Sequence, residues 1–131
     1  MKIFFKYQGP AFLWALLILV LCSVSFGSVG HSHLFFAGFD KLVHCGLFFV
    51  LAIFMCTGVI RKHNAIDFTV ISALKVFLLA LCYGALIEVL QKFVFTWRGA
   101  EWADLFSDSV GAGMGIFSTL AILYASTNAK D

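Results

Sequence analysis

Charged residues are scarce in this sequence. Only 12% of its 131 residues are Asp, Glu, Lys or Arg, and 62% are hydrophobic, whereas soluble domains carry about 25% charged residues. The formal net charge is only +2 and the basic residues are scattered, so the sequence gives no reason to expect a nucleic-acid partner. The composition indicates an integral membrane protein and leaves little room for a soluble domain.

Proline and paired cysteines are also scarce. The four cysteines stand singly inside apolar runs, without the CxxC spacing of a zinc site or a disulfide framework, which favours a packing role. Leu21 precedes Cys22, where a lipoprotein cleavage site has a small residue, so we expect the first apolar segment to be retained. An HExxH motif is missing as well. His, Asp and Glu side chains could still ligate zinc or a hard cation, but no metal and no cofactor is predicted.

Long apolar runs are what the sequence does have. A spanning helix needs roughly 20 apolar residues, and four such runs lie at about 11–29, 40–60, 68–91 and 104–124. Pro10 is expected at the start of the first helix, where its missing N–H costs nothing. The sequence therefore predicts an all-α membrane protein, with a four-transmembrane-helix bundle as one domain over 1–131.

The distribution of basic residues predicts the orientation, because Lys and Arg near span ends stay in the cytoplasm. One side holds six of them and the other three: Lys2, Lys6, Arg61, Lys62, Lys75 and Lys130 against Lys41, Lys92 and Arg98. Lys75 lies near the entry side of its span, so its side chain is expected to reach the interface. Both termini are predicted to be cytoplasmic.

Polar residues recur within the spans at matched depth. Spacings of three or four residues place them on common helix faces: Asp40 with His44, Glu88 with Gln91, and Asp104 with Asp108. His44, Glu88 and Asp108 would each lie about 5 to 6 Å below the outer rim. Because charges avoid lipid, these groups predict an outward-opening polar pocket. Its expected walls are His44, Glu88, Asp108 and Tyr83, and its expected rim is Asp40, Lys41, Gln91, Arg98, Glu101 and Asp104.

The residue types in this pocket suggest acid–base chemistry on an anionic ligand. A half-buried carboxylate such as Glu88 suits a general acid or base, and His44 held by Asp40 could exchange protons near neutral pH. The candidate catalytic or pocket-lining residues are Glu88, His44 and Asp108. The candidate binding residues are Asp40, Lys41, Tyr83, Gln91, Arg98 and Asp104, among which Arg98 suits a phosphate or carboxylate. No Ser or Cys nucleophile with an adjacent base is visible, so whether the protein is an enzyme stays open.

Two further motifs have less specific interpretations. Gly111 and Gly115 form a GxxxG face that lets two helices approach closely; we expect packing within the bundle, with Gly84 and Ala85 as a facing surface, and a homodimer as the alternative. His31 and His33 lack a third ligand nearby and are expected to be solvated loop residues.

Four separated motifs resemble those of the VanZ-like family of small bacterial membrane proteins. They are DKLVHCGLF at 40–48, YGALIEVLQ at 83–91, Arg98, and DLFSDSVGAGMG at 104–115. The resemblance implies a helical domain in the bacterial inner (cytoplasmic) membrane with an envelope role; the name-giving member is associated with resistance to teicoplanin. Asp108 stands where many members have Asn, which adds a negative charge to the predicted pocket.

Three functions are compatible with these features. The first is binding or modification of an anionic membrane lipid or lipid-linked envelope precursor. The second is a structural or assembly role, in which the polar residues only join the helices. The third is a small proton-coupled transporter, since intramembrane carboxylates mark ion paths.

Overall fold

The computed structural model describes residues 2–24, 38–63, 68–95 and 101–128, and these contain four α-helices and no strand. The helices are α1 (Lys2–Ser23), α2 (Phe39–His63), α3 (Val70–Phe93) and α4 (Trp102–Asn128). Each is long and apolar enough to cross a membrane. The expected all-α fold with four membrane-spanning helices is confirmed.

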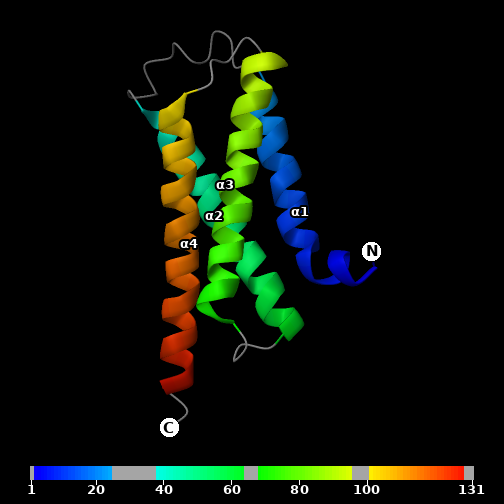
Figure 1. Cartoon of the computed structure of the whole chain (residues 1–131), viewed down its shortest axis with the longest axis vertical. Coiled ribbons are helices and arrows are strands. Elements are labelled where there is room, and N and C mark those ends of the chain that lie inside the picture. Colours follow the sequence, from blue (N-terminus) through cyan, green and yellow to red (C-terminus); the bar gives the residue numbers. More distant parts are fainter. Residues whose placement is uncertain (1, 25–37, 64–67, 96–100, 129–131) are drawn as a thin grey trace.

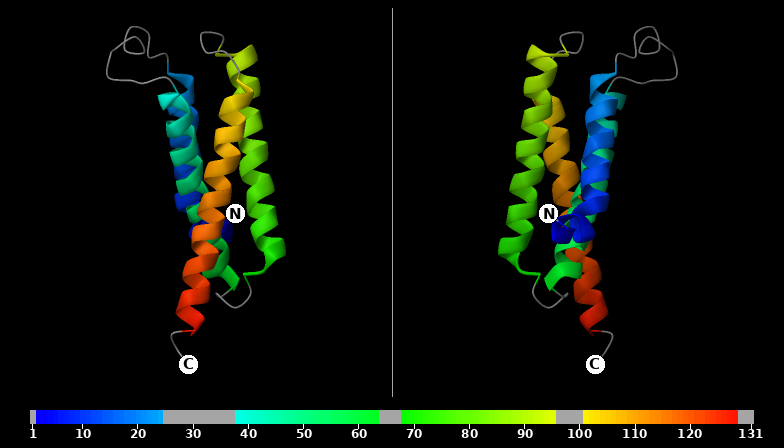
Figure 2. Two further views of the ribbon diagram at one scale, coloured as in Figure 1. Left: turned by 90° about the vertical axis from the view of Figure 1, so that its left-hand side faces the viewer. Right: turned by 90° about the vertical axis from the view of Figure 1, so that its right-hand side faces the viewer.

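The helices alternate in direction, so the beginnings of α2 and α4 lie at the same end of the bundle as the end of α3 (Figure 1). α2 packs most extensively against α4, and α2 and α3 each contact the other three helices. In the side views α4 runs obliquely across the bundle, and its last turns extend beyond the other helices (Figure 2). This topology brings polar residues from three helices to one end.

Apolar side chains occupy both the interior and the outer surface. Phe48, Ile18 and Ile87 are fully buried in the core, while Phe117 and Leu13 are exposed on the outside. An apolar outer face suits hydrocarbon surroundings, where helices satisfy their own backbone hydrogen bonds. Apolar residues are spread around each helix instead of being confined to one face. This distribution is typical of helices in a membrane bundle, whereas helices of a soluble bundle have one apolar and one polar face.

The helix ends follow the predicted spans within a few residues for α2, α3 and α4, but α1 differs. The prediction that Pro10 starts the first helix is wrong, because Pro10 lies inside α1. A proline in a helix lacks the N–H of one hydrogen bond and its ring clashes with the preceding turn, which bends the helix. The first, dark-blue turns of α1 do turn away from the axis of the rest (Figure 1). α1 ends at Ser23, and the rest of the predicted span, from 25 onward, lies outside the described residues.

The GxxxG face of α4 packs against the backbone of α2. A Cβ atom at Gly111 would clash with the carbonyl oxygen of Cys45, and one at Gly115 with that of Phe49. Packing within the bundle is confirmed, but the facing surface is α2 and not Gly84, which lies against Asp108. A homodimer through the same glycines would have to displace α2, and it stays a prediction.

Candidate functional site

The end of the bundle at which α2 and α4 begin carries a group of polar side chains that we call the polar cluster. Its members come from the first turns of α2, the last turns of α3 and the region where α4 begins: Asp40, Lys41, His44, Glu88, Gln91, Glu101, Asp104 and Asp108. The carboxylates of Asp40 and Asp104 stand in the first turns of their helices, where the helix dipole favours negative charge. The expectation that three helices bring these groups together is confirmed.

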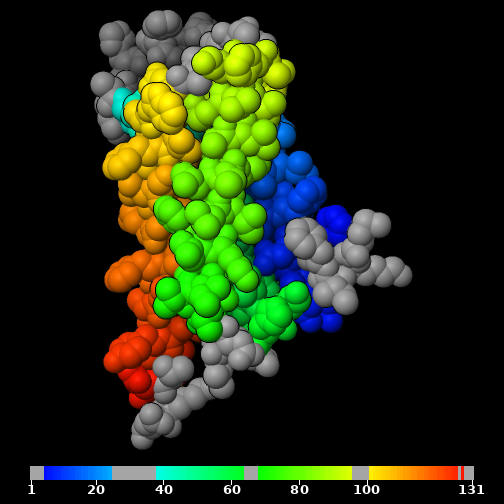
Figure 3. All heavy atoms as spheres, in the orientation of Figure 1, coloured from blue at the N-terminus to red at the C-terminus, as the bar shows by residue number. Residues whose placement is uncertain are grey.

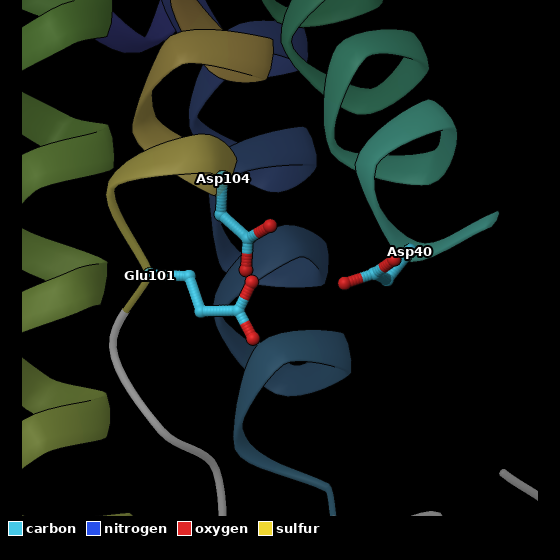
Figure 4. Close-up of side chains that lie close together, drawn as sticks. All are labelled: Asp40, Glu101 and Asp104. Atoms are coloured by element: carbon cyan, nitrogen blue, oxygen red, sulfur yellow. The ribbon is translucent and has the colours of Figure 1, made fainter. Parts of the chain in front are cut away.

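Lys41 joins three carboxylates at the exposed edge of the cluster. Its Nζ lies 3.0 Å from Oδ2 of Asp40, 2.8 Å from Oε2 of Glu101 and 3.4 Å from Oδ1 of Asp104. The three carboxylates converge from the starts of α2 and α4 (Figure 4), with ligand oxygens within 4.8 Å of one another. Such oxygens suit a hard cation. In this arrangement, however, the ammonium group of Lys41 already supplies the positive charge and connects α2 to α4.

His44 lies deeper, between two carboxylates of α4. Its Nδ1 is 2.9 Å from Oδ1 of Asp108, and its Nε2 is 4.0 Å from Oδ2 of Asp104. All three side chains are at least nine-tenths buried. The expectation that Asp40 holds His44 is not met, since Asp40 pairs with Lys41. The close approach of α4 at Gly111, next to Cys45, is what brings Asp108 alongside His44.

Glu88 connects α3 to the beginning of α4. Its Oε2 accepts a hydrogen bond of 2.9 Å from the backbone N–H of Glu101. The carboxylate also lies close enough to interact electrostatically with Asp104, His44 and Asp108. Glu88, which the sequence analysis expected at the same level as His44 and Asp108, therefore interacts with both. We call these three side chains one electrostatic unit.

Several buried oxygen atoms of the cluster have no hydrogen-bond partner in the part of the chain that the structure describes. They are Oε1 of Glu88, Oε1 of Gln91, Oδ1 of Asp104 and Oδ2 of Asp108. Oδ1 of Asp104 still lies at ion-pair distance from Lys41. Oδ2 of Asp108 rests against Gly84, where an added Cβ would be 2.8 Å away. Leaving a buried polar group unsatisfied costs about 1 to 3 kcal/mol, and more for a charged group.

The inner part of the cluster is packed, because His44, Gln91, Asp104 and Asp108 are each less than 5% exposed. Asp40, Lys41 and Glu101 are partly exposed at its edge. The open pocket expected from the sequence includes Arg98, which lies outside the described residues, and it stays a prediction. Five carboxylates face one lysine and one histidine among the described residues. The cluster therefore offers hydrogen-bond acceptors and negative charge, which suit donor groups or cations more than an anion.

Two predicted site residues connect α3 to α1. The hydroxyl of Tyr83 donates a hydrogen bond to the carbonyl oxygen of Ala15, and the amide of Gln91 donates one of 3.4 Å to that of Cys22. Tyr83 is thereby directed toward α1 rather than toward His44. It lines a cavity in the other half of the bundle, which the sequence analysis missed.

Some predicted residues lie outside the described part of the chain. Arg98, the expected anion-binding residue, falls in 96–100, and His31 and His33 fall in 25–37.

Comparison of the chain with protein-family models, with curated proteins and with solved structures gave no match.

Proposed function

We propose that this chain is a bacterial envelope protein of the inner membrane that binds or modifies a membrane lipid or lipid-linked precursor through the polar cluster. The observation that carries the proposal is the pair of unsatisfied buried oxygens on Glu88 and Asp108, in the same electrostatic unit as His44. A network that only joined helices would need one or two satisfied pairs. Surplus buried carboxylates in a membrane bundle are costly, and such groups mark functional sites.

The charge of the cluster specifies which part of a ligand can reach it. Acceptor oxygens bind hydroxyl or ammonium donors, whereas a phosphate would be repelled except beside a cation. Lys41 is the cation of the cluster among the described residues, and Arg98 stands nearby in the sequence. The proposal therefore favours a ligand with a hydroxyl-rich head, such as a lipid-linked saccharide, whose anionic group stays outside the cluster.

A catalytic form of the proposal uses His44 and Asp108. In the tautomer that donates Nδ1–H to Asp108, the carboxylate holds the ring in place, and Nε2, 4.0 Å from Oδ2 of Asp104, would be the nitrogen that exchanges protons. Nε2 would take a proton from a hydroxyl or a water molecule, and Glu88 would be a second acid–base group. Such a pair supports hydrolysis or transfer at a phosphate or glycosyl centre.

The alternative, a structural role, is favoured by the contacts that cross between helices. Lys41 bridges α2 and Glu101, and Glu88 binds the backbone just before α4. A transporter has less support, since the carboxylates of the described residues all lie at one end of the bundle. The VanZ-like resemblance and its link to glycopeptide resistance stay predictions.

The test compares the lipids that remain bound to three forms of the purified full chain. Native mass spectrometry of the wild type, Glu88→Gln and Ser107→Ala would identify them. Ser107 is a matched control because its hydroxyl binds a carbonyl of its own helix, Ala103. We expect a defined hydroxyl-rich lipid on the wild type and on Ser107→Ala, and its loss in a folded Glu88→Gln variant. The same unspecific phospholipids on all three would contradict the proposal and favour the structural role.

A further inference from the structure

A cavity of about 650 Å³ lies between α1, α2 and α3, in the half of the bundle away from the polar cluster. Toward that end α1 and α3 move apart, and the second half of α2 is seen between them (Figure 1). In the space-filling view, the side chains of α1 (blue) lie beside those of α3 (green) (Figure 3). The cavity is therefore a space where three helices diverge, and it shares no polar cluster residue.

The length of the cavity matches one leaflet of a bilayer. Its lining on α3 extends from Ser72 to Tyr83, which is about 17 Å along a helix with a rise of 1.5 Å per residue. The hydrocarbon core of a bilayer is roughly 30 Å thick. Phe12 and Leu79, which line the cavity, are also 43% and 60% exposed, so the cavity reaches the outer surface. An apolar cavity that opens to hydrocarbon takes up an acyl chain in preference to water.

Apart from Tyr83, the polar side chains that line this cavity lie at one end of it. They come from the first turns of α1, the last turn of α2 and the first turns of α3: Tyr7, Gln8, Lys62, His63, Ser72 and Lys75. Two of them, Lys62 and Lys75, are cations with no ion pair to a described carboxylate. Every carboxylate of the described residues belongs to the polar cluster at the opposite end; Asp67 and Asp131 lie outside the described residues. Among the described residues the mouth of the cavity is thus positive, and the predicted orientation places it on the cytoplasmic side.

We propose that this cavity binds an anionic phospholipid, with one acyl chain between α1 and α3 and the phosphate beside Lys62 and Lys75. The charge at the mouth selects this occupant, because basic pockets between spanning helices on the cytoplasmic side attract anionic headgroups. A zwitterionic lipid would fill the same apolar space without this attraction. The site is separate from the polar cluster, so it stands whether or not the cluster binds a ligand.

The headgroup is tested by competition between two lipids on the delipidated full chain. Native mass spectrometry with equimolar phosphatidylglycerol and phosphatidylcholine would measure which lipid each variant retains. The variant Lys62→Gln/Lys75→Gln removes the two cations of the mouth. Its matched control is Lys6→Gln/Arg61→Gln, which removes two exposed cations from the same end of the bundle that do not line the cavity.

We expect the wild type and the control to retain phosphatidylglycerol about tenfold or more over phosphatidylcholine, since each nearby Lys contributes about 1 kcal/mol. The mouth variant should lose that preference. Equal losses in both double variants would show attraction by the whole surface and overturn the proposal, as would a wild type without preference. Glu88→Gln should leave the preference unchanged, which separates this site from the polar cluster.

Crosslinking would show where the acyl chain of the bound lipid lies, and it needs no substitution in the protein. Phosphatidylglycerol with a diazirine in one acyl chain should label cavity residues such as Leu51, Met55 and Ala80. Labels confined to the outward residues Phe106 and Phe117 of α4 would show that the lipid only surrounds the bundle, and would overturn the proposed position.

Discussion

Nδ1 of His44 on α2 lies 2.9 Å from Oδ1 of Asp108 on α4, and both side chains are buried. The two residues are 64 positions apart in the chain, so their contact depends on the close packing of α2 against α4. The remaining oxygen of Asp108 rests against Gly84 of α3. One carboxylate thus contacts two other helices at the level of the proposed site.

Replacing Asp108 by Asn should separate the structural role of this pair from its chemical role. The amide oxygen of Asn can still accept a hydrogen bond from Nδ1, and the change removes a negative charge near Asp104. We expect Asp108→Asn to melt at or above the temperature of the wild type, with lipid binding altered. His44→Ala should lower the free energy of unfolding by about 3 kcal/mol, because it leaves Asp108 buried without its partner.

Thermal unfolding in detergent and in lipid nanodiscs would measure both variants. A loss of stability in Asp108→Asn as large as that in His44→Ala would show that the charge of Asp108 is needed to hold the helices together, against this prediction.

The close contact of α4 with α2 predicts opposite effects at two glycines of one helix. Gly111→Ala places a Cβ against the carbonyl of Cys45, whereas a Cβ at Gly113 meets nothing within 4 Å. We expect Gly111→Ala to destabilise the bundle by about 1 to 3 kcal/mol through overpacking. Gly113→Ala should be neutral or stabilising by up to about 1 kcal/mol through helix propensity. Equal unfolding temperatures for the two variants would contradict the observed packing.

The sequence was sufficient to predict the helices and the common level of three polar groups along the bundle. Apolar runs of about 20 residues leave few options other than spanning helices, and short connections make neighbouring helices antiparallel. Counting 1.5 Å per residue from the ends then brought His44, Glu88 and Asp108 to one level, which the structure confirms.

Contacts that depend on how whole helices pack could not be predicted in this way. Tyr83 and Glu88 are five residues apart, which places them about 140° apart around the helix axis, so Tyr83 turns toward α1. The partner of His44 depends on the approach of α4, which Gly111 permits. The cavity arises where α1 and α3 diverge, and the local clue was limited to small lining residues such as Ala11 and Ala80.

Lys41 forms ion pairs with three carboxylates and offsets part of their negative charge. Without Lys41 the three carboxylates should bind another cation. In Lys41→Ala the oxygens of Asp40, Glu101 and Asp104 remain within reach of one another without their ammonium partner. We expect a loss of stability below about 1 kcal/mol for each of the two exposed ion pairs, with Asp40 and Glu101, a further loss from the buried carboxylate of Asp104, and recovery when millimolar Ca²⁺ binds the folded state. Lys92→Ala, which removes an exposed cation from α3, is the control and should not respond. A melting temperature of Lys41→Ala that is insensitive to Ca²⁺ would contradict the role assigned to Lys41.

The proposed envelope function predicts that activity in cells depends on Glu88 beyond its effect on folding. Glu88→Gln keeps the size of the side chain and an acceptor for the N–H of Glu101, so we expect near-normal amounts of folded protein in the membrane. It removes the charge and the acid–base capacity, so any decrease in teicoplanin susceptibility that the wild type confers should be lost. Measuring growth inhibition by teicoplanin at matched protein levels, beside Ser107→Ala, checks this. Full protection by Glu88→Gln would remove Glu88 from the proposed chemistry. Protection lost in proportion to protein amount would assign Glu88 to the stability of the bundle.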